Sequence, residues 1–219
     1  MKLTFKIFGV ALLGLMILTT SCKKEENITS VKDAQGNTYK VVRIDKMFWM
    51  AQNLKNSKGM TVLNYTQLPS GWSTSTACCS YYAGNSSNAA YNAMGLSYNS
   101  VAMKKNPCPE GWHVPTSSEW KEMINYLGGA NVAGGKLKDK DNNTYWQNNI
   151  GASNETGFTA QGSGCMNNGI AFGYRTYALY WSSDMQVYVI ENSSTKIESG
   201  AGNIQNGCSI RCVKAVEKK

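Results

Sequence analysis

A short apolar run followed closely by a cysteine indicates that this chain is exported and folds outside the cytoplasm. Lys2 and Lys6 give a basic start, residues 7–18 are largely apolar, and Cys22 follows a few small polar residues later. This order is typical of a bacterial export signal that ends at a lipidation site, and the run is shorter than the about 20 residues of a membrane-spanning helix. We therefore expect residues 1–21 to be removed and Cys22 to become the diacylated first residue of the mature protein. The alternative is an ordinary secretory signal with an incidental cysteine.

One folded domain is expected after a short tether. Residues 22–30 contain the charged run 23–27, which resembles the lysine-plus-acids signal that directs lipoproteins of Bacteroidetes-type bacteria to the outer face of the outer membrane. A solvated linker is a compatible alternative. Removing 21 of the 219 residues leaves 198, enough for one large domain or two small ones. Because no proline cluster, charge block or heptad repeat divides that stretch, we expect a single domain over residues 31–217.

Six cysteines remain after Cys22, and an even number in an exported chain indicates disulfides. They are Cys78, Cys79, Cys108, Cys165, Cys208 and Cys212. A bridge between the neighbours Cys78 and Cys79 would be strained. Cys208 and Cys212 are four residues apart on a predicted strand, which would separate them by about 13 Å, too far to bond. We therefore expect the cysteines to bond across the fold, and the 15 pairings that six cysteines allow stay open at this point.

Hydrophobic patterns predict an α+β domain of short antiparallel strands and long loops with one prominent helix. That helix is predicted over residues 117–127, because Thr116 and Glu119 form a capping box and apolar residues then recur at i, i+3, i+4 and i+7. A short helix is predicted at 89–94 and a loop opening at 134–138. Strands are predicted at 38–44, 47–50, 177–181, 186–191 and 209–216, with a further strand beginning at 157–160.

Several segments match the motifs of a known family, in the same order. They are 33–39 (DAQGNTY), 48–54 (FWMAQNL), 108–116 (CPEGWHVPT), 119–120, 127–129, 134–138 (GGKLK), 154–160 (NETGFTA), 180–183 (YWSS) and 209–214 (SIRCVK). Over residues 33–214 the chain resembles the Fibrobacter succinogenes major paralogous domain. It departs from that pattern at 161–164, where the family more usually has a Leu-Pro-Gly-Gly-Tyr-Arg-like run, and Cys165 and Cys208 look like additions to it.

The resemblance implies an exported protein without an established activity and a C-type-lectin-like fold, which formylglycine-generating enzymes share. In that fold a cysteine near the first helix bonds one in the last strand. The resemblance therefore implies a disulfide between Cys108 and Cys212.

No catalytic, metal or cofactor site stands out. His113 is the one histidine, and we expect it to be a structural, hydrogen-bonded residue rather than a general base. Asp139 and Asp141 open like a calcium-binding loop, but Thr144 and Ile150 replace the glycine and the glutamate that such a loop needs. We therefore expect a non-enzymatic protein without a metal or cofactor.

Aromatic side chains are the remaining candidates for binding. We expect Trp49, Trp112, Trp120 and Trp181 to pack the core, since they lie in the family motifs. The polar middle segment is less constrained and would more readily supply ligand contacts, for instance to sugar rings. Its candidates are Tyr65, Trp72, Tyr81, Tyr82, Tyr91 and Tyr98.

These observations lead to three hypotheses. The first is a lipid-anchored protein of the outer membrane, exposed at the cell surface, that presents a loop-rich domain for adhesion or for binding a glycan or protein ligand. The second is a structural component of a surface or secreted assembly, and the third, ranked last, is a hydrolase or oxidoreductase. A nucleic-acid partner is not expected, because removing Lys2 and Lys6 from 22 basic residues leaves 20 against 14 acidic ones, scattered and without interleaved stacking aromatics.

Overall fold

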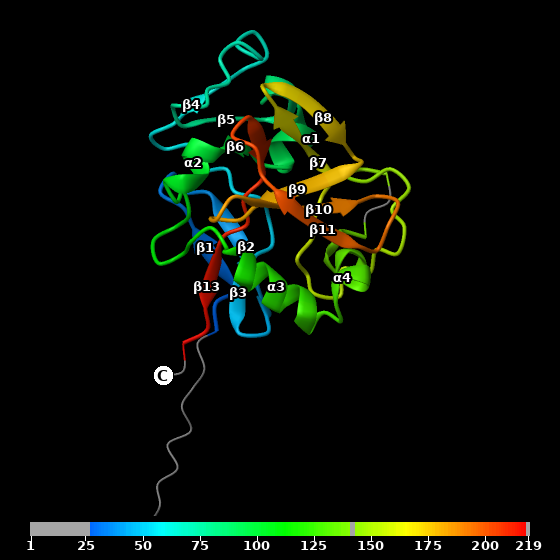
Figure 1. Ribbon diagram of the computed structural model, residues 1–219. Helices are drawn as coiled ribbons and strands as arrows, with labels where there is room; N and C mark the ends of the chain where they lie inside the picture. The colour runs from blue at the N-terminus through cyan, green and yellow to red at the C-terminus, as the bar shows by residue number, and fades with distance from the viewer. Residues whose placement is uncertain (1–26, 141–142, 218–219) are drawn as a thin grey trace, which may run out of the picture.

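The first sheet brings the two ends of the domain together. In this computed structural model, which describes residues 27–140 and 143–217, the sheet has the strand order β1-β2-β3-β13. Its strands are β1 (Ser30–Lys32), β2 (Thr38–Ile44), β3 (Met47–Met50) and β13 (Val213–Ala215). β13, the last strand, pairs with β3 in antiparallel register, with Val213 opposite Trp49. The strands predicted at 38–44 and 47–50 are confirmed (Figure 1).

The second sheet has nine strands, and their order is β11-β10-β9-β7-β12-β6-β5-β4, with β8 paired to β7. The strands are β4 (Thr61–Val62), β5 (Cys78–Ser80), β6 (Ser97–Asn99), β7 (Ser163–Asn167), β8 (Ile170–Tyr174), β9 (Tyr177–Trp181), β10 (Gln186–Glu191), β11 (Ile197–Ala201) and β12 (Asn206–Cys208). The predictions at 177–181 and 186–191 are confirmed. The expectation of antiparallel pairing holds for most pairs, but β4 pairs parallel with β5 and β7 parallel with β9.

The strand predicted at 209–216 is wrong over its first half. β12 ends at Cys208 in the second sheet, and β13 begins at Val213 in the first. Between them the chain crosses from one sheet to the other: the Ser209 amide donates to Leu179, and the Cys212 carbonyl accepts from the Met50 amide. Cys208 therefore ends a strand of the second sheet, whereas Cys212 lies in the crossing segment just before β13, so the two cysteines do not share one strand.

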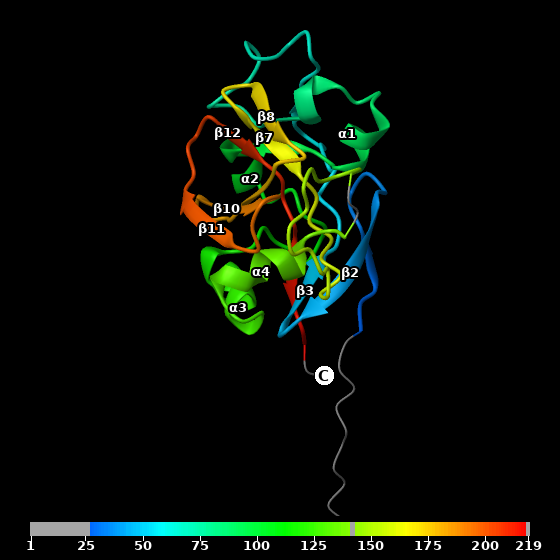
Figure 2. The ribbon, with the colours of Figure 1, turned by 90° about the vertical axis from the view of Figure 1, so that its right-hand side faces the viewer.

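Five short helical segments cover the sheets (Figure 2). They are η1 (Tyr82–Gly84), α1 (Ala89–Ala93), α2 (Ser100–Lys104), α3 (Ser117–Tyr126) and α4 (Ala130–Leu137). The helix predicted at 117–127 is confirmed as α3, including the capping box in which the Thr116 hydroxyl accepts from the Glu119 amide. The short helix predicted at 89–94 is confirmed as α1.

Two local predictions are wrong, and both errors have a tertiary cause. A loop is expected at 134–138, but residues 134–137 are the second half of α4 and only Lys138 has left the helix. Gly134 lets the helix pack against the segment before β11, since a Cβ there would lie 2.2 Å from the Lys196 carbonyl oxygen. The strand expected from 157–160 does not form, and Ala160 makes only an isolated bridge with Lys138.

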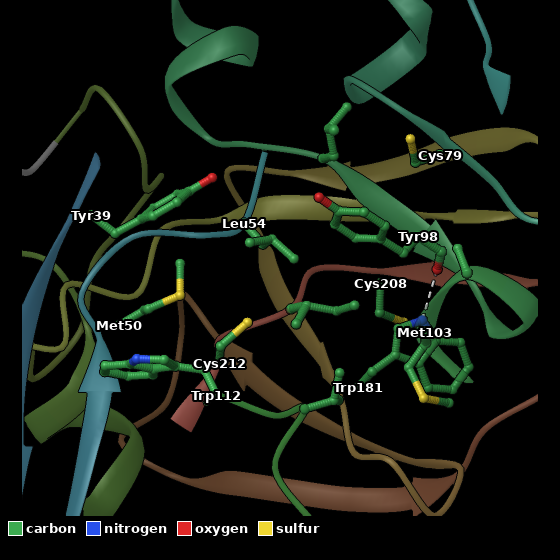
Figure 3. Close-up of a cluster of buried hydrophobic side chains, with 14 of the residues drawn as sticks. Tyr39, Met50, Leu54, Cys79, Tyr98, Met103, Trp112, Trp181, Cys208 and Cys212 are labelled. Carbon is green, nitrogen blue, oxygen red and sulfur yellow. Dashed lines mark hydrogen bonds between the residues drawn. The ribbon is translucent and has the colours of Figure 1, made fainter. Parts of the chain in front are cut away.

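The core is aromatic, as predicted. Trp49, Trp112, Trp120 and Trp181 are all buried. The Trp120 ring stacks on Tyr188 with centroids 4.8 Å apart. Figure 3 shows Trp112 and Trp181 among the side chains of the larger core cluster, where the Trp181 indole donates to the Tyr98 carbonyl at 2.7 Å.

The described residues thus form a mixed α+β domain made mostly of strands, which confirms the coarse fold class. No helix among them is long and apolar enough to cross a membrane. The expected signal peptide, Cys22 and the start of the tether, together with Asp141, lie outside the described residues.

Candidate functional site

Three tyrosine rings form a cluster at one end of the molecule. Tyr82 of η1, Tyr91 of α1 and Tyr174 of β8 have centroids 5.2, 5.3 and 5.0 Å apart, which is within the range of favourable aromatic contacts. All three are only partly buried. The cluster lies at the end opposite α3 and α4 (Figures 1 and 2).

A tight turn brings a fourth tyrosine to the same end. Gly84 has a positive φ of 68°, and a Cβ there would lie 2.2 Å from the Tyr65 amide nitrogen, so only glycine allows this approach. Tyr65 itself is 72% exposed. It lines a cavity of about 240 Å³ together with Asn64, Gly84, Asn85, Ser86 and Ser87.

Apolar side chains on β8 extend this surface. Ile170 and Phe172 are 62% and 41% exposed, and they alternate along the strand with Tyr174 at its end. We call Tyr65, Tyr82, Tyr91, Phe172 and Tyr174 the aromatic surface. Burial raises the pKa of Tyr82 and of Tyr174, so both phenols are neutral at physiological pH and available as hydrogen-bond donors and acceptors.

Three of the six predicted contact residues lie on the aromatic surface, namely Tyr65, Tyr82 and Tyr91. Tyr81 is half-buried against the larger core cluster. Trp72 and Tyr98 are buried, because their polar atoms are satisfied inside the fold: the Trp72 indole donates to Gln205 and the Tyr98 hydroxyl to the Asn56 carbonyl. These two residues pack the interior and do not contribute to the surface.

Tyr174 and Phe172 were missed by sequence reasoning. The signal for them is the alternation of Ile170, Phe172 and Tyr174 after the Asn168-Gly169 turn, a pattern typical of a strand with one apolar face. The pairing of β8 with β7 is what brings Tyr174 to Tyr82 and Tyr91, more than 80 residues earlier in the chain.

His113 is hydrogen-bonded, as expected of a structural histidine. Its Nε2 lies 2.8 Å from Glu119 Oε1, while the other oxygen of Glu119 accepts from the Thr116 amide in the capping box. The hydrogen bond from Glu119 raises the pKa of His113. Burial acts to raise the pKa of Glu119, but its bonds with His113 and Thr116 outweigh this and leave the pKa lowered.

This ion pair predicts a bell-shaped contribution to stability. The raised pKa of His113 gives stability that is full at low pH and lost as pH rises through the folded-state value. The lowered pKa of Glu119 gives stability that is full above its unfolded-state value and lost as pH falls. Urea unfolding of the wild type and of His113→Gln should therefore differ most near about pH 5 to 6, by about 0.5 kcal/mol because the pair is partly exposed.

The control for this prediction is Glu122→Gln, an exposed residue of the same helix. It removes a carboxylate from α3 without touching the pair of His113 and Glu119, and it should show no such maximum. A difference between wild type and His113→Gln that stays constant from about pH 3 to 9 would contradict the ion-pair account.

The disulfide that the resemblance implied, between Cys108 and Cys212, is present, with Cα atoms 5.8 Å apart. The broader expectation that the cysteines bond across the fold is met in this structure for this pair alone, and Cys78, Cys79, Cys165 and Cys208 are buried with free thiols here.

Two buried cations are held by neutral oxygens. The Lys138 ammonium donates to the carbonyls of Ile150, Glu191, Asn192 and Ser194 at 2.6 to 3.3 Å, and burial lowers its pKa to about 8. The Arg211 guanidinium is also fully buried. Both cations tie separate segments of the chain together.

Clusters of metal-ligating side chains and the other cavities add no further candidate for a functional site. Within residues 27–140 and 143–217 no group of three or more His, Cys, Asp or Glu side chains is placed to hold a metal ion. A cavity of about 550 Å³ is lined by Asn143, Asn148, Asn149, Ile150 and Ser193, which offer neither an aromatic ring nor a titratable group.

Comparison with known proteins gives one match. The family model described as the Fibrobacter succinogenes major domain matches residues 42–214. Neither a curated protein nor a solved structure matches the chain.

Proposed function

This chain belongs to the Fibrobacter succinogenes major domain family, and from its amino-terminal sequence and its aromatic surface we propose that it is a lipid-anchored, non-enzymatic protein of the cell surface that binds glycans. The anchor is Cys22, the tether extends to about residue 30, and the domain presents the aromatic surface to the outside of the outer membrane. The carrying observation is the cluster of Tyr82, Tyr91 and Tyr174 next to the exposed ring of Tyr65.

The chemistry of this surface suits a sugar. The apolar faces of pyranose rings stack on aromatic rings, while their hydroxyl groups need hydrogen-bond partners. Here the tyrosines adjoin Asn64, Asn85, Ser86 and Ser87, whose amides and hydroxyls are uncharged donors and acceptors. A neutral carbohydrate therefore fits better than a charged ligand.

The finer fold assignment is also part of the proposal. A C-type-lectin-like domain is supported by short strands separated by long loops and by the pairing of β13 with the early hairpin. The Cys108–Cys212 bond also supports it, because it joins the segment before α3 to the residue just before the last strand. In such a domain the loops distant from the paired ends are free to vary, which is where the aromatic surface lies.

Binding is predicted to depend on Tyr65. Residues 23–219, applied to an array of host and plant polysaccharides, should bind at least one glycan class. Tyr65→Ala should weaken that binding about 10-fold or more, equivalent to about 1.4 kcal/mol, because it removes an exposed stacking ring. Titration calorimetry with the glycan selected on the array measures the change.

Tyr126→Ala is the matched control. Tyr126 is 61% exposed on α3, at the other end of the molecule, so its loss changes the same amount of aromatic surface without touching the proposed site. Equal weakening by both variants, or silence of the wild type on the whole array, would contradict glycan binding at this surface.

A structural role in a surface assembly is the second candidate. One observation favours it. Among the described residues β8 pairs only with β7, so no strand lies along its other edge, and β8 carries the exposed Ile170 and Phe172. Such a strand edge can pair with another chain. Crosslinking on cells followed by sedimentation of the purified domain separates this role from glycan capture.

A further inference from the structure

Two of the buried thiols face each other across neighbouring strands. β7 and β12 pair in antiparallel register, with Asn167 opposite Asn206 and Met166 opposite Gly207. The next position of that register places Cys165 opposite Cys208. Past this position the hydroxyl of Ser163 in β7 lies 3.2 Å from that of Ser209, the residue after β12, so the two segments stay close on both sides of the cysteines.

Opposed residues of an antiparallel pair suit a disulfide. Their side chains point to the same face, and their Cα atoms are about 4.5 to 5.5 Å apart, within the about 4.4 to 6.8 Å that a disulfide spans. The burial pattern agrees with this assignment. Cys165 and Cys208 both contribute to the larger core cluster, whereas Met166 contributes to the small cluster on the opposite face.

The same register excludes the other two thiols. Cys79 lies opposite Tyr98, and Tyr98 lies opposite Cys208, so Cys79 and Cys208 are two strand spacings apart, about 9.6 Å. Cys78 points to the opposite face and packs with Leu63 and Trp72. Neither Cys78 nor Cys79 can therefore reach Cys165 or Cys208 without moving a strand.

We propose that Cys165 and Cys208 form a second disulfide in the exported protein. The two thiols lose two protons and two electrons, the Sγ–Sγ bond forms, and the electrons reduce the disulfide of a thiol–disulfide oxidoreductase to two thiols. The exchange takes place during folding, before β12 closes on β7 and buries both sulfurs. Because β7 also pairs with β8, the bond would hold the strand that carries Tyr174; the proposal rests on the export part of the proposed function and not on glycan binding.

Peptide mapping tests this bond directly. Trypsin cleaves after Lys196 and Arg211, which places Cys208 in peptide 197–211 and Cys212 in the separate peptide 212–214. Envelope-purified protein, alkylated while denatured and digested without reductant, should yield 141–175 linked to 197–211. It should also yield 106–121 linked to 212–214, and two alkylated thiols, Cys78 and Cys79. After reduction the first linked pair should disappear.

Variants supply the matched controls. Cys165→Ala should raise the number of alkylated thiols from two to three, since Cys208 loses its partner, while Cys78→Ala should lower it to one and keep both linked pairs. Four alkylated thiols together with an intact Cys108–Cys212 link would overturn the proposal.

A protein that is not exported gives a different result. It would stay in a reducing compartment, so Cys108 and Cys212 would also be alkylated in protein taken from cells. In that case the purified chain is unfolded and refolded in a buffer of oxidised and reduced glutathione. Formation of the 141–175 to 197–211 link there supports the proposal, and its absence while 106–121 links to 212–214 overturns it. A negative glycan array changes neither outcome.

Discussion

Replacing Arg211 by methionine should lower the free energy of unfolding by about 4 kcal/mol, which would be the largest loss expected from any single side chain in this domain. Arg211 is fully buried between the two sheets. Its guanidinium donates to the Asn53 side chain and to the backbone carbonyls of Met50, Phe158 and Thr159. Methionine fills a similar volume but leaves these acceptors without a donor, and each buried unsatisfied acceptor costs about 1 to 3 kcal/mol.

The position of these acceptors explains why one residue matters so much. Met50 ends a strand of the first sheet, Phe158 and Thr159 belong to the loop after α4, and Arg211 lies in the crossing segment between the sheets. The guanidinium also stacks over the Phe158 ring at 4.5 Å. The side chain thus joins three segments that lack a regular backbone ladder between them.

Urea unfolding followed by tryptophan fluorescence measures the loss. Arg43→Met is the matched control, since Arg43 is exposed in β2 and the same substitution there should change stability by less than about 0.5 kcal/mol. Arg211→Lys should recover only part of the loss, because an ammonium on a shorter stem cannot reach all the oxygens that the planar fork reaches. A loss below about 1 kcal/mol for Arg211→Met would contradict the account.

Lys138, like Arg211, is a buried cation that donates to backbone carbonyls of separate segments. Its ammonium is surrounded by four backbone carbonyls from the loop before residue 151 and from the segment between β10 and β11. In both places a side-chain cation satisfies carbonyls that irregular backbone would otherwise bury unpaired. This explains how a domain with long loops can bury so much non-repetitive chain.

The elements that sequence predicts well are those whose signals are local. The capping box of Thr116 and Glu119 defines the start of α3, and alternation within 38–44 defines β2, because both depend on contacts a few residues apart. Sequence does not predict α4 because Gly134 and Gly135 are poor helix formers. Both positions need glycine because Lys196 and Gly151 approach too closely for a side chain, and no local pattern reveals these contacts. The break between Cys208 and Val213 depends on two sheets that no local pattern reveals.

The candidate site was predictable in part for the same reason. Composition indicated that aromatic residues of the middle segment would form a surface, and Tyr65, Tyr82 and Tyr91 do lie together. Burial of Trp72 and Tyr98 depends on acceptors supplied by Gln205 and Asn56, which no spacing in the sequence connects to them. Tyr174 joins the cluster only through the pairing of β7 with β8.

Removing the Cys108–Cys212 bond should have the second largest effect, a loss of about 2 to 4 kcal/mol in the free energy of unfolding. The bond closes a loop with a sequence separation of 104 residues, so it removes a large part of the freedom of the unfolded chain. In the folded state it fixes the segment before α3 to the crossing segment just ahead of β13. The double variant Cys108→Ala/Cys212→Ala should therefore unfold at a lower urea concentration than the wild type, with both proteins kept oxidised.

Reductant added to that double variant separates the two bridges. If Cys165 and Cys208 are bonded, dithiothreitol lowers the stability of the double variant further. If they are not bonded, the unfolding curve of the double variant does not change when dithiothreitol is added. Glu122→Gln changes an exposed residue and keeps every cysteine in place. Its loss of stability in dithiothreitol therefore measures the effect of reducing both bridges together. A change below about 1 kcal/mol between the oxidised wild type and the oxidised double variant would show that packing of β13 on β3 holds the chain end without the covalent bond.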